Sequence, residues 1–134
     1  MLEIICDPPA RSKSVDCCFL QTVRMVDGDD LIAQARWQAA SDPAQGVAQL
    51  LELWVSPTRR RQGYGRKLMD AVTAQAMEHF RSRRSPLRRM WMAVEQKQQV
   101  NGRSFLMQFG FNHVGTVSEL LKDEDLLVYM RTFN

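Results

Sequence analysis

The chain has 134 residues, of which 45% are hydrophobic and 25% charged, a composition typical of one folded domain with a hydrophobic core. No apolar run approaches the roughly 20 residues of a membrane span, and the N-terminus lacks the pattern of a secretory signal. The net charge of +3 suits an anionic ligand but is too small to indicate nucleic-acid binding. We therefore expect a single domain over residues 1–134 that does not associate with a membrane.

The cysteines point to a reducing compartment. Cys6, Cys17 and Cys18 lack metal-ligand spacing, and their odd number argues against a disulfide framework. Free thiols are typical of proteins kept in a reducing cytosol. The sequence therefore predicts a cytoplasmic protein without a bound metal.

The first half of the chain predicts an antiparallel meander. Hydrophobic residues alternate partly with polar ones in three runs, which an Asp-Gly turn and a Pro-containing turn separate. The three predicted strands cover residues 17–26, 31–40 and 47–55. The segment LEIIC at residues 2–6 is a candidate for a further strand before them.

The second half mixes helices and strands. After Gly65, hydrophobic residues recur at three- and four-residue steps, which predicts a helix that ends before Pro86. A nearly continuous apolar strand over 88–95 predicts burial on both of its faces. A weaker helix and two final strands follow, over residues 99–109, 113–120 and 125–133. This order predicts an α/β (α+β) fold, with helices on the faces of one sheet.

The passage from the third strand into the first helix reads VSPTRRRQGYGRKLM (55–69). Glycines at a helix N-terminus let a ligand approach its unpaired N–H groups, and the neighbouring arginines add positive charge. Such a turn suits a phosphate group. It is neither a P-loop nor a Rossmann turn, because the Gly-Lys-Ser/Thr and the third glycine are missing. From charge and glycines alone, a capped turn with solvated arginines is an equal alternative.

The sequence of this segment resembles that of a known family. The residues RRQGYG (60–65) fit the (Arg/Gln)-x-x-Gly-x-(Gly/Ala) signature of the GCN5-related N-acetyltransferase (GNAT) family, and GYGRKLM is similar to its histone-acetyltransferase branch. SFLMQFGF (104–111) is similar to the second family motif. The resemblance covers roughly residues 15–134 and implies a mixed, mostly antiparallel sheet flanked by helices. The usual two helices between the first and second strands are missing from this chain.

The resemblance implies an N-acetyltransferase that moves an acetyl group from acetyl-CoA to an amine by direct attack. In the family, the strand before the signature pairs with the pantetheine arm, the signature amides hold the pyrophosphate, and an Asn contacts CoA. The corresponding cofactor-binding residues here are Leu53, Trp54, Val55, Arg60, Arg61, Gln62, Gly63, Tyr64, Gly65, Arg66 and Asn101. The backbone amide of Val55 would stabilise the developing oxyanion. The side chains of Arg59 and Arg61 are expected to be solvated.

The catalytic side chains depart from the family pattern. The usual base positions fall at Gln49 and Leu51, and the usual acidic Tyr falls at Leu106. Glu52 is the only carboxylate nearby on the strand, and we select it as the candidate base. Regular alternation places Glu52 on the face opposite Gln49 unless a bulge re-aims it, and a structural or solvent-facing Glu52 is the alternative. The alternative function is a catalytically weak or inactive GNAT-like module that binds CoA or a protein partner.

Two expectations concern partners. The acceptor is expected to be an amine of a small molecule or a protein. The second expectation concerns assembly: without the two helices, one flank of the sheet, near Trp37 and residues 17–20, would be exposed. We therefore predict a homodimer that covers this flank. A cluster of arginines over residues 81–89 lacks an aromatic platform and follows a helix C-terminus, which argues against nucleic-acid binding.

Overall fold

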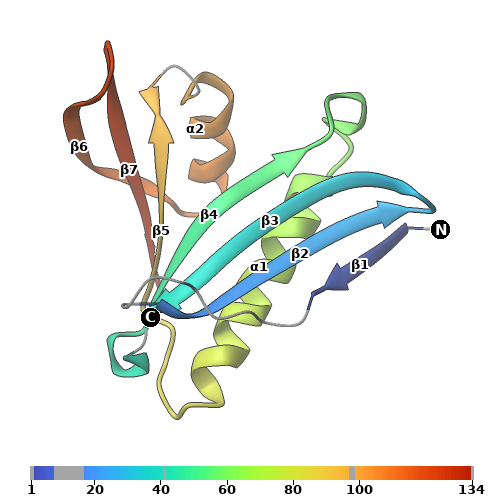
Figure 1. The fold of residues 1–134 in the computed structure, drawn as a ribbon, viewed down its shortest axis with the longest axis horizontal. Helices are drawn as coiled ribbons and strands as arrows, with labels where there is room; N and C mark the ends of the chain where they lie inside the picture. The colour runs from blue at the N-terminus through green and yellow to red at the C-terminus, as the bar shows by residue number, and fades with distance from the viewer. Residues whose placement is uncertain (1, 8–16, 41, 97–98, 134) are drawn as a thin grey trace. The chain divides into compact units, whose positions relative to one another are not determined.

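The computed structural model describes residues 2–7, 17–40, 42–96 and 99–133 (Figure 1). They form two compact units, Met1–Leu87 and Arg88–Asn134, each with its own strands and one α-helix. The expectation of a single domain over residues 1–134 stays a prediction.

The first unit contains the predicted meander. Its strands β1 (Leu2–Cys6), β2 (Cys17–Asp27), β3 (Asp30–Ala40) and β4 (Val47–Val55) pair in sequence order, each antiparallel to the one before. Gly28 in the β2–β3 turn has a φ of 61°, a left-handed conformation that glycine adopts without strain. The 3-10 helix η1 (Pro43–Gln45) joins β3 to β4. The meander over residues 17–55 and the strand at LEIIC are therefore confirmed.

The helix α1 (Tyr64–Arg81) follows β4 after the 3-10 helix η2 (Pro57–Arg59) and lies against one face of this sheet (Figure 1). Hydrophobic residues at the predicted three- and four-residue steps face the sheet, although Met77 is 45% exposed. The buried side chains of α1 are Leu68, Met69, Val72, Ala76, His79 and Phe80. The fully buried residues of β2 and β3 alternate along the strands except at Ile32, where the pairing of β3 with β2 shifts by one residue. They are Val23, Met25, Ile32, Ala33, Ala35, Trp37 and Ala39. The layer between α1 and these strands is the core of the first unit.

The second unit has β5 (Arg89–Glu95), α2 (Gln99–Gln108), β6 (Asn112–Leu121) and β7 (Glu124–Thr132). β7 pairs antiparallel with both β5 and β6. The predicted burial of β5 on both faces is wrong. Met90 and Val94 are buried and Met92, on the same face, is partly buried, whereas neither Trp91 nor Ala93 on the other face is buried. A continuous apolar run therefore does not guarantee two buried faces, because one face can hold most of the core contacts.

Both α-helices of the described residues begin after residue 63, so no α-helix is found between β1 and β2 in that part of the chain. Residues 8–16, which connect these two strands, lie outside the described residues. Within the described ranges, neither helix has the length and apolar character needed to cross a membrane.

Candidate functional site

The end of β4 directs backbone groups away from β3. Ala33 lies directly opposite Val55, and the amide of Ser56 donates to the carbonyl of Ile32 at 2.7 Å. A hydrogen bond between the flanking residues identifies Ala33 and Val55 as a non-hydrogen-bonded pair. In such a pair, the N–H and C=O groups point away from the partner strand. The amide of Val55 therefore points to the edge of β4 that does not face β3.

The same alternation separates the next two residues of the predicted cofactor strand. Leu53 lies opposite Ala35, two positions from the Val55 pair, so its N–H and C=O groups also point away from β3. Trp54 lies opposite Gln34 between them, and its backbone groups face β3. Its side chain is 36% exposed. Of these three residues, Leu53 and Val55 direct their backbone groups away from β3, whereas Trp54 directs only its side chain away from the pairing with β3.

The turn between η2 and α1 contains two left-handed residues within three positions. Arg61 has a φ of 64° and Gly63, the N-cap of α1, has a φ of 80°. Left-handed residues in a turn direct successive N–H groups into one concavity, which binds anions. A side-chain Cβ at Gly63 would meet no atom within 4 Å, so the space beside this residue is open. The unusual conformation of Arg61, a non-glycine residue, is a local strain of the kind often found at functional sites.

The first turn of α1 begins at Tyr64 and includes Gly65 and Arg66. The first N–H groups of any helix lack intrahelical acceptors, and the N-cap residue here, Gly63, has no side chain to cap them. The positive end of the helix dipole is located here. Gln62 is exposed just before it. The predicted signature residues are thus gathered at one open, electropositive helix end.

The three arginines before this turn differ in what they contact. Arg59 lies 3.7 Å from a carboxylate oxygen of Asp27 and 3.8 Å from one of Asp30, both in the β2–β3 turn. The side chain of Arg59 is 31% exposed, so it is partly solvated, as predicted, and also lies near these two carboxylates. These carboxylates lie on a different part of the chain, and sequence spacing alone could not show that the two turns meet.

Arg60 is tied to the strand that precedes it. Its Nε donates to the carbonyl oxygen of Val55 at 3.2 Å, which is possible because this carbonyl points away from β3. Arg61 is exposed, and no hydrogen bond or ion pair of its side chain is found among the described residues. Arg60 therefore links the end of β4 to the turn, and Arg61 is the arginine available to an anionic ligand.

β4 carries one extra residue relative to β3. Arg36 pairs with Glu52 and Trp37 pairs with Leu50, so Leu51 has no partner on β3. A bulge of this kind changes the face on which the following side chains lie. Leu50 faces α1 and is 1% exposed, whereas Glu52 lies on the opposite face.

This opposite face, here called the polar face, carries two cross-strand pairs. The Nε2 group of Gln34 donates to Oε1 and Oε2 of Glu52 at 3.2 and 3.3 Å. Gln38 Nε2 donates to Oε1 of Gln49 at 2.8 Å. The bulge that could re-aim Glu52 is therefore present, and Glu52 shares a face with Gln49. The catalytic role of Glu52 stays a prediction.

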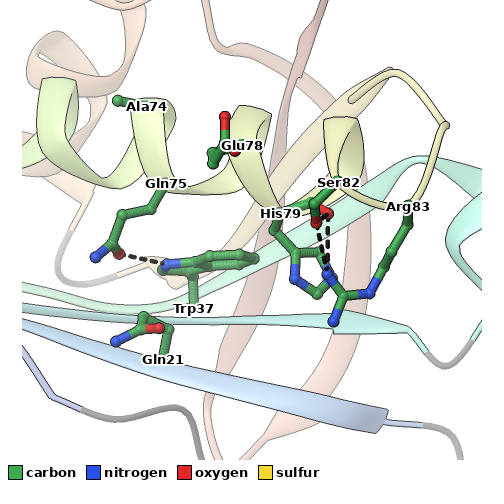
Figure 2. A pocket seen from close by; sticks show the side chains of 8 residues that line it. All are labelled: Gln21, Trp37, Ala74, Gln75, Glu78, His79, Ser82 and Arg83. Carbon is green, nitrogen blue, oxygen red and sulfur yellow. Dashed lines mark hydrogen bonds between the residues drawn. The ribbon is translucent and has the colours of Figure 1, made fainter.

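A buried cluster at the other end of α1 was missed by the sequence reasoning. Trp37 Nε1 donates to Oε1 of Gln75 at 3.2 Å, and the ring of His79 lies edge-on to Trp37, with ring centroids 5.7 Å apart (Figure 2). His79 is 7% exposed, and its burial, together with the charge of Arg83, lowers its pKa to about 4. These side chains line an open pocket of about 440 Å³ beside α1 and strands β2 and β3.

The placement of Trp37 corrects the sequence-based reasoning. Trp37 is 0% exposed, so it is not part of an exposed flank. It shares its face of β3 with Ala33 and Ala35, whereas Gln34 and Arg36 point to the polar face. This apolar–polar alternation was the available signal for its burial. The side chains of residues 17–19, also assigned to that flank, lie outside the described residues.

Residues 5–111 match the sequence model of the acetyltransferase (GNAT) family. The chain belongs to this family. Members of the GNAT family are acetyltransferases, and this supports an acyl-transfer activity in general terms. No curated protein matches the chain.

Three solved structures share the GNAT fold with this chain. The ribosomal-protein-S18-alanine N-acetyltransferase from Escherichia coli is 17% identical, with a TM-score of 0.66 over 90% of this chain and 71% of that one. An IAA acetyltransferase from Bacillus cereus is 10% identical, with a TM-score of 0.71 over 85% and 78% of the two chains. A protein from Bacillus anthracis, solved in complex with acetyl coenzyme A, is 14% identical, with a TM-score of 0.72 over 92% and 66%. At these identities the likeness establishes a common fold.

Two positions of the family pattern lie in the second unit of this GNAT chain. The backbone of Asn101 is in α2, but its side chain lies outside the described residues, so its predicted contact with CoA stays a prediction. Leu106, at the usual position of the acidic Tyr, is 2% exposed. A larger side chain there would overpack the core. Within the described residues no three His, Cys, Asp or Glu side chains could hold a metal ion together, and the expectation of no metal stays a prediction.

Proposed function

We propose that this chain is an N-acetyltransferase that moves the acetyl group of acetyl-CoA to an amine by direct attack. The observation that carries the proposal is the uncapped N-terminus of α1, preceded by the left-handed residues Arg61 and Gly63 and joined to a strand end with outward-pointing amides. The similar Bacillus anthracis protein, solved with acetyl coenzyme A, supports the choice of cosubstrate.

The proposed cofactor contacts follow the local geometry. The amides of residues 60–66 would hold the pyrophosphate at the positive end of α1. Leu53 and Val55 would pair with the amide groups of the pantetheine arm, and the side chain of Trp54 would flank it. Asn101 is proposed as a further contact to CoA.

The proposed chemistry needs a base and an oxyanion donor. A free amine has a pKa near 10, so most of it is protonated at neutral pH and a proton must be removed before attack. We propose that the carboxylate of Glu52 accepts this proton from the amine, directly or through one water. As the new N–C bond forms, the Val55 amide would stabilise the carbonyl oxygen. The C–S bond then breaks, and the thiolate takes its proton from water, because Leu106 cannot supply one.

We also propose that the protein works in the cytoplasm as a homodimer. The exposed edge strand β1 carries Leu2 and Ile4, which are 37% and 46% exposed. Apolar side chains on an open strand edge are usually covered by another chain. Light scattering of wild type and of Ile4→Lys tests this assembly, and a wild-type monomer at micromolar concentration would contradict it.

The reaction is tested by measuring thiol release from acetyl-CoA with four amines: an alanyl peptide, a lysyl peptide, spermidine and kanamycin. Thiol release that depends on one of them, together with a product heavier by one acetyl group in mass spectrometry, is the expected result. A protein that binds CoA calorimetrically but releases no thiol with any amine would support the alternative, a binding module without turnover.

A further inference from the structure

The polar face holds the carboxylate of Glu52 in a defined place. Gln34 Nε2 lies 3.2 Å from Oε1 and 3.3 Å from Oε2, so one amide group contacts both oxygens. Gln34 and Glu52 are not directly opposite each other, because Gln34 pairs with Trp54 and Glu52 pairs with Arg36. The contact is therefore a diagonal cross-strand interaction, of a kind that long side chains can make on one face of a sheet.

A cationic partner for Glu52 is close in the register but does not bind it. Arg36 lies directly opposite Glu52, yet no ion pair of Glu52 is found in the described part of the chain. Arg24, on the same face of β2, is instead bound to Asp7 at 2.7 Å. The partner that holds Glu52 is thus the neutral amide of Gln34.

The neutrality of this partner has a chemical consequence. An ionised carboxylate has about four lone-pair positions, of which Gln34 would occupy about two. The remaining positions can accept a proton or a water. An arginine would offset the negative charge and favour the charged form, which would weaken the carboxylate as a base. An amide donor fixes the orientation of the group without adding an opposite charge beside it.

We propose that Gln34 is a positioning residue that orients Glu52 toward the attacking amine. This proposal rests on the base role of Glu52 in the proposed function. Gln34 does not contact the reacting atoms in this scheme and acts only through Glu52. It lies 18 residues before Glu52 in the chain and meets it because the register of β3 and β4 places both side chains on the polar face.

The test is a double-mutant cycle on thiol release with the amine that the four-amine comparison selects. Glu52→Gln is expected to lower kcat by about 100-fold or more, as loss of a positioned base does. Gln34→Met is expected to lower kcat by about 10-fold, with the KM for acetyl-CoA unchanged, because the hydrogen bond that orients the charged group is lost. In the Glu52→Gln background, Gln34→Met should cause no further loss.

Two further variants make the result specific. Gln34→Asn keeps a polar amide but is too short to reach Glu52. It should therefore lower kcat as much as Gln34→Met does, and an equal loss in both variants would exclude poor folding of the methionine variant as the cause. Gln38→Met is the matched control, because it breaks the neighbouring amide pair on the same strand and face, Gln38–Gln49. Whatever its own effect, it should be additive with Glu52→Gln.

The outcomes separate the two levels of the proposal. If Glu52→Gln keeps full kcat, or if no amine supports turnover, the proposed base role is wrong and the inference fails with it. If Glu52→Gln is impaired but Gln34→Met and Gln34→Asn are normal, or additive with it, Gln34 is not a positioning residue, although the proposed function stands.

Discussion

The two ends of α1 differ in the hydrogen bonding of their terminal backbone groups. At the N-terminus the cap is Gly63, which has no side chain to accept from the first amides, and the adjacent space is open. At the C-terminus the last carbonyls are well supplied with donors. The carbonyl of His79 accepts from Ser82 Oγ at 2.7 Å and from Arg83 Nη1 at 3.0 Å.

This difference shows how one helix serves two purposes. Unsatisfied amides at a helix end have to bond to water or a ligand, so the N-terminal end is suited to binding. Buried side chains and satisfied carbonyls contribute to folding free energy, so the C-terminal end is suited to stability. Changes at the C-terminal end should therefore alter the free energy of unfolding without altering CoA affinity, and changes at the N-terminal end should do the reverse.

The largest effect is expected from Trp37→Ala at the stability end. Truncating a fully buried Trp removes its packing and its hydrogen bond to Gln75, which should lower the free energy of unfolding by about 3–5 kcal/mol. Urea unfolding measures this change. Trp54→Ala, at a 36% exposed tryptophan, is the matched control and should lose less than about 1 kcal/mol. Equal losses in the two variants would mean that the cluster around Trp37 adds no special stability.

A pH-dependent loss of stability should arise from His79. Its folded pKa of about 4 lies below the ordinary value of 6.5, so the unfolded chain binds more protons between these values. The contribution of His79 is fully present above pH 6.5 and is lost as the pH falls toward 4, by about 3 kcal/mol at most. Subtracting the stability curve of His79→Gln from that of wild type isolates this part. A difference that stays constant across the window would rule out a neutral, buried His79.

Part of the fold could be predicted from the sequence alone. Alternation of polar and apolar residues correctly predicted the meander, and three- and four-residue spacing predicted α1, because each of these elements buries one face. The same alternation in LIAQARWQA should also have indicated that Trp37 is buried, since it follows Ala33 and Ala35 at two-residue steps. The expectation of an exposed flank near Trp37 did not use this signal.

The candidate site was predictable in one part only. The family signature located the turn at residues 60–65, because its glycines and helix start are local features. The bulge at Leu51 depends on how β4 pairs with β3, so local sequence could indicate only that one was possible. The Gln34–Glu52 and Arg59–Asp27 contacts join residues far apart in the chain, and only the register of the sheet and the packing of the two turns bring them together.

At the binding end, Gly65→Asp should weaken CoA binding by about 100-fold, or about 2.7 kcal/mol. The new carboxylate would lie close to the proposed pyrophosphate, and two like charges about 5 Å apart near a surface repel by about 3 kcal/mol. An acidic residue in the first turn of a helix favours folding, so the loss should occur in a folded protein. Calorimetry of CoA binding measures it.

Gly65→Ala is the control for this variant, since it adds a Cβ without a charge within the helix. It should bind CoA far better than Gly65→Asp. The same pair of substitutions at Gly63 would be harder to interpret, because any side chain at a residue with a φ of 80° also strains the backbone. If Gly65→Asp binds CoA as well as wild type, the phosphate assignment at this end of α1 is wrong.

The smallest effect is expected from Ser82→Ala at the stability end. The variant removes the Oγ–H donor to the carbonyl of His79, but Arg83 still donates to the same oxygen, so the free energy of unfolding should fall by only about 0.5–1 kcal/mol. Ser85→Ala is the matched control, because no side-chain hydrogen bond of Ser85 is found among the described residues. Both variants should keep wild-type CoA affinity, because neither touches the N-terminal end of the helix. A loss of CoA affinity in Ser82→Ala alone would show that the two ends of α1 are coupled, and that stability and binding cannot be assigned to separate ends.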